Sequence, residues 1–425
     1  MRNDSIRYWL IFPLACTLFV LSQFYRVSVA VITLDLVRDL AIDTAGLSLI
    51  SAAFFYAFAL MQIPISLVLD GIGARKSMTM LSLVAAIGAV MFAMGDSLAV
   101  LAAGRILMGI GMACNLVGTL KLITLWYNPF RFGTLSALVF SLGTLGNLVA
   151  ATPLVLMVQA VGWRNAFLII AGFNFLITMA FYLVVRDRPS QSRFPEISGA
   201  KTLQFAEMWI NLLRLFRKRD YWVISLGTFC RYGIFAAVQS LWAAPFLIHV
   251  MGISAVSTGN LLLIMSIGTV IGSPICGWLS DALKNRKRII IAGLLGMGIC
   301  LVLVSSLRGN ASMPVLGALF FGFGFFNGAG GIMYAHIKER MPIEQAGTAM
   351  TGINFFTMFG VAVFLQGLGG MMEALHPGDS LGNGAFTDAF WFCAICLGLT
   401  AGLYLLTRET LIGQDRNPGP PDQGK

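Results

Sequence analysis

The stretch Ser66-Leu-Val-Leu-Asp70-Gly-Ile-Gly73-Ala-Arg75-Lys76 joins two long apolar runs. A related stretch, Gly277-Trp-Leu-Ser-Asp281-Ala-Leu-Lys-Asn-Arg286-Lys287-Arg288, lies about half the chain further on and again joins two apolar runs. A short basic connection at the same place in both halves indicates a duplicated membrane protein rather than a long globular one.

The composition of the 425-residue chain points to the same class. Hydrophobic residues make up 57% of it and charged residues 11%, and the mean hydropathy is +0.82. Soluble domains carry about 25% charged residues, so this chain has too little charge to be soluble as a whole. A bilayer-crossing helix needs roughly 20 apolar residues, and the apolar runs predict twelve such spans. They cover residues 8–34, 47–69, 77–95, 98–126, 133–159, 163–185, 221–249, 257–280, 289–307, 311–336, 346–373 and 387–407.

Lysine and arginine are distributed unequally over the connections between these spans. With the N-terminus placed inside, most of the 29 basic residues face the inner side, and three, Arg38, Arg164 and Arg308, face the outer side. The positive-inside rule therefore predicts that both termini are inside. The first run has no small-residue cleavage site after it, so we expect it to remain as a span. The basic clusters are not interleaved with aromatic residues, which argues against a nucleic-acid partner.

The connections also divide the chain into parts. Residues 1–185 are expected to form one six-helix bundle and residues 221–410 a second. Residues 186–220 are expected to be a cytoplasmic linker with an amphipathic helix along the inner membrane face. The tail 411–425 is rich in proline, glycine and polar residues, a composition typical of disorder.

The paired basic loops make the chain resemble the major facilitator superfamily over nearly its whole length. The family's loop after the second span has Gly, then Asp, then Gly-x-Arg-Lys. Its counterparts here are Asp70, Gly73, Arg75 and Lys76, with Ser66 in place of the usual Gly, and in the second half Gly277, Asp281, Arg286 and Lys287. The resemblance implies two pseudo-symmetric six-helix bundles, a monomer, and a latch role for these residues in the outward-facing state. The alternative is that they only anchor a cytoplasmic turn.

Four basic residues fall inside predicted spans: Arg26, Arg105, Lys121 and Arg231. Every carboxylate sorts to a span end or a connection. A cation in hydrocarbon costs several kcal/mol unless it is paired or wetted, so the available partners are carbonyls, hydroxyls, water and an anionic ligand. Arg105 lies in Gly104-Arg105-x-x-x-Gly109-x-Gly111, which resembles the family's fourth-span motif, and we expect it to be structural. Arg26 and Arg231 each offer a planar fork of donors that suits carboxylate or phosphate.

The segments Phe24-Tyr25-Arg26 and Arg231-Tyr232-Gly233 resemble the arginine-bearing helices of organophosphate:phosphate antiporters and wider organic-anion porters. The resemblance implies that the first and seventh spans line the central cavity. Ser28 stands where that subfamily usually has Asn, and its Pro follows the seventh-span Arg sooner than Pro245 does here. The resemblance therefore implies anion binding but not specificity for phosphate. The predicted substrate-binding residues are Arg26, Arg231, Tyr25, Tyr232, Gln239, Trp242, Asn115, Lys121, Asn327, Tyr334 and Asn354. The alternative for the two arginines is structural bonding to neighbouring carbonyls. For Lys121 it is a position near the inner end of the span, from which the side chain reaches the interface. For the uncharged polar residues it is helix–helix hydrogen bonding.

We therefore predict a secondary transporter of a small organic anion in a bacterial inner membrane, with a proton as a candidate coupling ion and no cofactor or metal. One alternative is an exporter of amphipathic drugs or siderophores, whose cavity the 32 Phe and 21 Met would line. The other is a sensor that binds a ligand without moving it. The sequence has no nucleophile–base set, which argues against an enzyme. Glycine clusters such as Gly328-x-Gly330-Gly331 lie within apolar runs and are interpreted as sites of close packing and helix bending.

Overall fold

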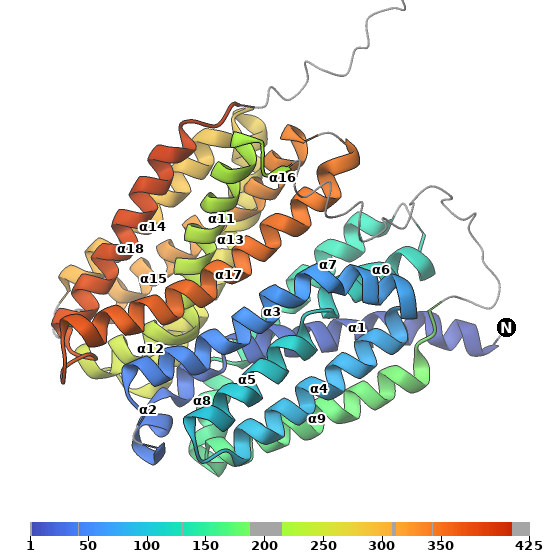
Figure 1. The fold of residues 1–425 in the computed structure, drawn as a ribbon, viewed down its shortest axis with the longest axis horizontal. Coiled ribbons are helices and arrows are strands. Elements are labelled where there is room, and N and C mark those ends of the chain that lie inside the picture. Colours follow the sequence, from blue (N-terminus) through green and yellow to red (C-terminus); the bar gives the residue numbers. More distant parts are fainter. Residues whose placement is uncertain are drawn as a thin grey trace, which may run out of the picture.

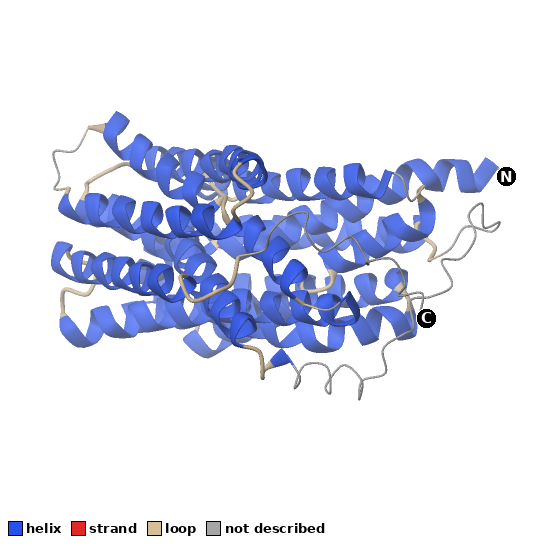
Figure 2. Ribbon diagram, turned by 90° about the horizontal axis from the view of Figure 1, so that it is seen from above, coloured by secondary structure: helices blue, strands red, loops and turns tan. Residues whose placement is uncertain are grey.

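The computed structural model describes residues 2–40, 42–128, 131–187, 215–307, 312–341 and 343–409. Over these ranges the chain is helical, with short connections and no strand (Figure 2). Twelve of the helical segments in this part are long and apolar enough to cross a membrane, which confirms the predicted spans. Nearly all of the predicted linker and the whole predicted tail from residue 411 lie outside the described residues.

Over its described residues, the N-terminal half contains six spans built from nine helices. These are α1 (Arg2–Val27), α2 (Val29–Leu40), α3 (Thr44–Ile72), α4 (Ala74–Met94), α5 (Leu98–Met112), α6 (Asn115–Trp126), α7 (Phe132–Val149), α8 (Thr152–Val161) and α9 (Trp163–Val184). The predicted first span, 8–34, is therefore divided at Ser28, whose hydroxyl donates to the carbonyl of Tyr25 and so competes with the helical pattern.

The C-terminal half contains the other six spans. Its elements are α11 (Arg219–Ala237), η2 (Val238–Trp242), α12 (Ala243–Pro245), η3 (Phe246–Val250), α13 (Ala255–Ala282), α14 (Arg286–Ser306), α15 (Met313–Asn327), α16 (Gly330–Arg340), α17 (Ile343–Leu375) and α18 (Asn383–Tyr404). The seventh span contains two π-helical segments, η2 and η3, and the tenth span is divided between α15 and α16. Such irregularities within spans are tolerated where neighbouring protein satisfies the backbone.

Glycine permits the close helix packing inside each half. A Cβ atom on Gly104 of α5 would lie 2.8 Å from the carbonyl oxygen of Gly88 on α4. In the other half, a Cβ atom on Gly324 of α15 would lie 2.0 Å from the carbonyl oxygen of Met265 on α13. Large apolar side chains such as Leu183 are exposed on the outside of the bundles, as residues that face lipid must be.

The two halves pack against each other along α3 and α17 (Figure 1). We name the two ends of the molecule by the predicted orientation, with both termini inside. The halves are joined at the outer end, where Thr152 lies 2.8 Å from Asn260 and Thr44 lies 2.6 Å from Ser380. From there the ribbons diverge toward the end that carries α6 and α16 (Figure 1).

Candidate functional site

Arg26 lies at the last turn of α1, just before the division of the first span. Its side chain is buried, and its guanidinium carbon lies 4.4 Å from the centre of the Phe58 ring of α3. The hydroxyl-bearing rings of Tyr232 and Tyr334, both from the other half, are within electrostatic range. The Nε atom is buried and has no hydrogen-bond partner in the part of the chain that the structure describes.

Arg231 lies in the middle of α11, in the opposite half. Its Nη1 donates to the backbone carbonyl of Asn327 at 2.9 Å and also to the side-chain oxygen of Asn327. The guanidinium carbon lies 5.7 Å from the centre of the Tyr232 ring. As in Arg26, the Nε atom is buried and has no partner. Each half therefore contributes one buried arginine whose Nε atom has no partner among the described residues.

Tyr334 of α16 connects the two arginines to the contact between the halves. It is within electrostatic range of both arginines. Its hydroxyl lies 3.3 Å from Oδ1 of Asn354 and 3.2 Å from the hydroxyl of Thr357. Asn354 in turn donates to Gln62 of α3, in the other half, at 2.8 Å. Tyr334 thus links the surroundings of the two arginines to a hydrogen bond that joins the halves.

The other predicted site residues make the following contacts among the described residues. Gln239 donates to Ser266 at 3.0 Å, Asn115 donates to the carbonyl of Leu18 at 3.2 Å, and Lys121 donates to the carbonyl of Leu69 at 2.7 Å. Trp242 is buried and packs edge-on against Phe386. Tyr25 is buried inside the N-terminal half, with its hydroxyl next to Asn174 of α9. The hydrogen bonds of Gln239, Asn115 and Lys121 are of the kind that helix–helix packing uses, whereas Nε1 of Trp242 is buried without a partner among the described residues.

Sequence reasoning missed several residues at the centre. Phe58 and Thr357 stand in apolar runs that contain many similar residues, so no local signal separates them. Gln62 is a lone amide within an apolar run of the second span, which is a usable signal. Gly330 was part of a glycine cluster interpreted as packing, and its proximity to Arg231 could not be read from the sequence.

Arg105 contrasts with the two central arginines. It is fully buried in the N-terminal half and donates to the carbonyls of Tyr25 at 2.6 Å and Ile50 at 3.4 Å. Its guanidinium carbon lies 4.7 Å from the centre of the Phe54 ring. Its Nη2 atom is also buried without a partner among the described residues. The contrast is that its two carbonyl contacts tie α5 to α1 and α3 within one half, which is the arrangement that a structural arginine needs.

Replacing Arg105 by alanine is expected to destabilise the protein, because two buried carbonyls lose their donor at a cost of about 1–3 kcal/mol each. We expect a lower unfolding temperature in a thermal scan of the purified protein. The half-saturating solute concentration for uptake should stay within about twofold, since the contacts lie inside one half. Wild-type stability combined with lost uptake would contradict the structural role.

Among the described residues, no carboxylate forms an ion pair with Arg26 or Arg231. In the described part of the chain, the ion pairs lie near the ends of the helices, and none includes either residue. At the outer end, for example, Asp39 accepts a hydrogen bond from Trp163 and another from Arg38, and these bonds lower the pKa of its carboxyl group. The central pair thus carries positive charge without a carboxylate in contact.

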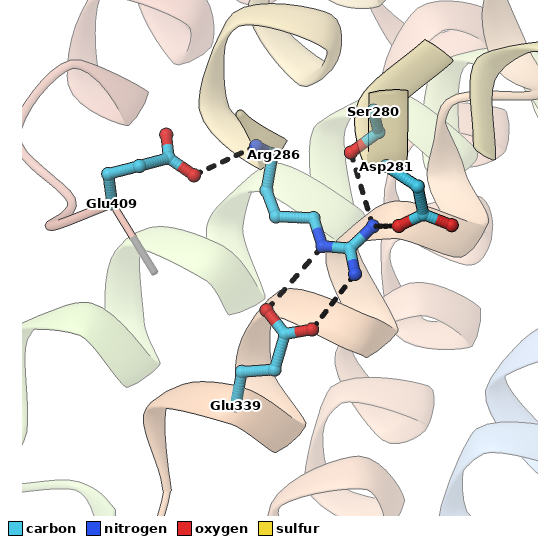
Figure 3. Close-up of polar contacts among 5 residues, drawn as sticks. All are labelled: Ser280, Asp281, Arg286, Glu339 and Glu409. Carbon is cyan, nitrogen blue, oxygen red and sulfur yellow. Dashed lines mark hydrogen bonds and ion pairs between the residues drawn. The ribbon is translucent and has the colours of Figure 1, made fainter. Parts of the chain in front are cut away.

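The basic loop of the C-terminal half forms a compact ionic cluster (Figure 3). The guanidinium of Arg286 lies between Asp281 and Glu339, with Nη2 3.0 Å from Glu339. The backbone N–H groups of Arg286 and Lys287 donate to the carboxylate of Glu409 at 2.8 and 3.1 Å. A carboxylate at a helix N-terminus is favourable because it meets free N–H groups and the positive end of the helix dipole.

The loop of the N-terminal half repeats this arrangement in part. The backbone N–H of Arg75 donates to Asp187 at 2.8 Å, and the Arg75 side chain donates to the carbonyl of Tyr182. Gly73 has a φ of +84°, and a Cβ atom there would lie 2.5 Å from the Asp187 carboxylate, so glycine fits this turn. The side chain of Asp70 lies outside the described residues. These contacts stay within one half, and the latch role of both loops remains a proposal.

Twelve spans in two packed halves define a multi-pass membrane protein. Its similarity to known proteins identifies it as a secondary transporter in a cell membrane. The family model for the Major Facilitator Superfamily matches residues 14–365 and 224–418. The chain belongs to this family, which also means that it is a transporter and not an enzyme.

Two relatives and one solved structure are informative. The chain is 24% identical to the probable sulfoacetate transporter SauU of Cupriavidus necator, over 65% of this chain and 66% of that protein. It is 21% identical to the probable galactarate/D-glucarate transporter GudP of Escherichia coli, over 97% and 94%. A bacterial homologue of the human lysosomal transporter Spinster, inward-facing and unoccupied, matches with a TM-score of 0.77, at 18% identity, over 94% of this chain and 96% of that one. This last likeness supports the fold.

Proposed function

We propose that the protein moves a small organic anion across the membrane and that Arg26 and Arg231 bind it. The observation that carries this proposal is the pair of buried guanidinium groups, one from each half, whose Nε atoms have no partner. A buried donor without a hydrogen bond costs about 1–3 kcal/mol. An oxyanion supplies both the missing acceptors and the missing negative charge.

The charge of the pair favours a solute with two acidic groups. Two guanidinium groups without a contacting carboxylate carry two positive charges, and a dianion neutralises both. Sulfoacetate and galactarate, the solutes in the names of the two relatives, each carry two acidic groups. We therefore propose a small dicarboxylate, a sulfonate–carboxylate or a phosphate ester as the substrate class.

The position of the pair supports alternating access as the mechanism. Because the arginines come from opposite halves, an anion that contacts both draws the halves together around a central site. The outer ends are joined in this structure, so the described state fits one that opens inward. The hydrogen bond between Gln62 and Asn354 lies beside the site, where a change at Tyr334 reaches it directly.

The charges around the two arginines also bear on how transport is coupled to an energy source. With no carboxylate in contact with Arg26 or Arg231 among the described residues, a membrane carboxylate that carries a coupling proton is not part of this site. We propose exchange, facilitated diffusion, or symport in which the proton travels on the substrate.

Uptake by purified protein in liposomes tests the proposal. The solutes are radiolabelled galactarate, sulfoacetate and glucose 6-phosphate, and tetraphenylphosphonium represents the lipophilic cations of an exporter. We expect saturable uptake of one anion and none of the cation. Uptake of the cation alone would favour the amphipath exporter. Binding of an anion without uptake would favour a sensor.

Replacing Tyr334 by phenylalanine is expected to raise the half-saturating concentration for uptake about fivefold to tenfold. This is the loss of affinity typical of one hydrogen bond. The phenyl ring keeps the packing of α16, and only the hydroxyl that faces both arginines, Asn354 and Thr357 is removed. The concentration dependence of uptake measures the effect. A half-saturating concentration equal to that of the wild type would remove Tyr334 from the proposed site.

A further inference from the structure

The division of the tenth span lies directly against Arg231. Helix α15 ends at Asn327, α16 begins at Gly330, and the backbone between them is irregular. The carbonyl of Asn327 at this point accepts a hydrogen bond from Arg231. An uninterrupted helix uses each such carbonyl for its own backbone, so the division makes this acceptor available.

Gly330 provides the space for the guanidinium. A Cβ atom on Gly330 would lie 2.1 Å from Cζ of Arg231, 2.2 Å from Nη2 and 2.3 Å from Nη1. The group therefore lies across the Gly330 backbone, and any larger residue would displace it. The neighbouring Gly331 has no such contact, because a Cβ atom there would meet nothing within 4 Å.

These contacts leave one edge of the guanidinium unused. The hydrogen bonds of Arg231 to described residues go through Nη1 alone, and Nε is buried without a partner. The Nε–H and the adjacent Nη2–H groups point in parallel, which is the geometry that binds two oxygens of one carboxylate. An arginine fixed in this way needs no reordering when the anion arrives, which favours binding.

We propose that Asn327 and Gly330 are positioning residues that fix Arg231 with its Nε edge directed at one oxyanion group of the substrate. The proposal rests on the anion-binding function proposed above. Arg26 has a different role under this proposal. Its guanidinium is stacked on Phe58 and lies next to Tyr232, with no backbone carbonyl fixing it among its described hydrogen-bond contacts, so it is the arginine that adjusts to the second acidic group.

The test compares Gly330→Ala with the matched variant Gly331→Ala in the galactarate and sulfoacetate uptake assay. Gly330→Ala displaces only the far end of a flexible side chain, so we expect a folded protein. Its half-saturating concentration should rise about tenfold or more, as expected when one charge-assisted fork is lost, with the maximal rate within about twofold of the wild type. Gly331→Ala should behave as the wild type. Equal effects of the two variants would overturn the proposal.

A second measurement needs no substrate and separates this inference from the proposed function. We measure how much Gly330→Ala lowers the unfolding temperature when it is introduced into the wild type, and how much when it is introduced into Arg231→Ala protein. Coupled residues give a clear drop in the first background and a smaller drop or none in the second. Equal drops in both would overturn the positioning role. If the wild type takes up none of the probe anions, the proposed function fails and this comparison still decides whether Gly330 positions Arg231.

Discussion

Replacing Arg26 or Arg231 by alanine is expected to abolish anion uptake, with a loss of about a hundredfold or more in uptake efficiency. Truncating one member of a buried, hydrogen-bonded charge pair costs about 2–5 kcal/mol, and a hundredfold corresponds to roughly 2.8 kcal/mol. The bound anion is the other member of each pair. Initial uptake rates into liposomes with equal amounts of protein give the measurement.

Two controls separate binding from folding in these variants. Arg105→Ala removes an equally buried arginine that donates to backbone carbonyls, and it should retain its affinity for the solute. Arg26→Lys and Arg231→Lys keep the charge but lose the planar fork, so we expect an intermediate loss. Uptake at the wild-type rate in both alanine variants, with normal elution on gel filtration, would remove the arginines from the mechanism.

Replacing Asn327 by aspartate is expected to weaken anion uptake about as much as replacing either arginine by alanine. The side-chain oxygen of Asn327 already accepts from Nη1 of Arg231, so the new carboxylate gains an ion-pair partner without moving. It neutralises the charge that attracts the substrate, and like charge in a low-dielectric site repels the anion strongly. We expect the half-saturating concentration for uptake to rise about a hundredfold.

Asn327→Ser is the matched control, because it removes the side-chain acceptor without adding charge. The backbone carbonyl of residue 327 remains available to Arg231. This variant should keep transport with an affinity weaker by about tenfold or less. If the serine and aspartate variants lose the same amount of affinity, the loss comes from the missing contact between the Asn327 side chain and Arg231, and the electrostatic explanation is wrong.

The sequence predicted the spans well because lipid imposes one strong constraint, a run of about 20 apolar residues. The two loops around Gly73 and Arg286 indicated the duplication and the resemblance to the Major Facilitator Superfamily. The match to the family model confirmed that family. Arg26 and Arg231 stood out by elimination, since few charges fall at membrane depth. The orientation of the termini and the roles of these arginines stay predictions.

The local geometry of the site was not predictable in the same way. Tyr25 and Tyr232 both adjoin an arginine in the sequence, yet only Tyr232 lies near the pair, while Tyr25 faces Asn174. Adjacent helical residues differ by about 100° in direction, and the packing of neighbouring helices decides which one faces the site. The contact of Gly330 with Arg231 likewise depends on how α15 and α16 are divided.

The inner-end carboxylates show the same limit. Asp187 and Glu409 follow the last span of each half and were counted only as loop charges. In the structure each accepts hydrogen bonds from the first residues of α4 or α14. Their partners are more than a hundred residues away in the chain, so only the packed bundles bring the groups together.

The most direct test of the central claim is the thermal stability of purified protein with galactarate, sulfoacetate, glucose 6-phosphate and tetraphenylphosphonium, measured in the wild type and in Arg26→Ala and Arg231→Ala. A ligand that binds the folded state raises the unfolding temperature by mass action. We expect one of the anions to stabilise the wild type and neither variant. Stabilisation by the cation alone, or by an anion that acts equally on all three proteins, would contradict anion binding by the two arginines.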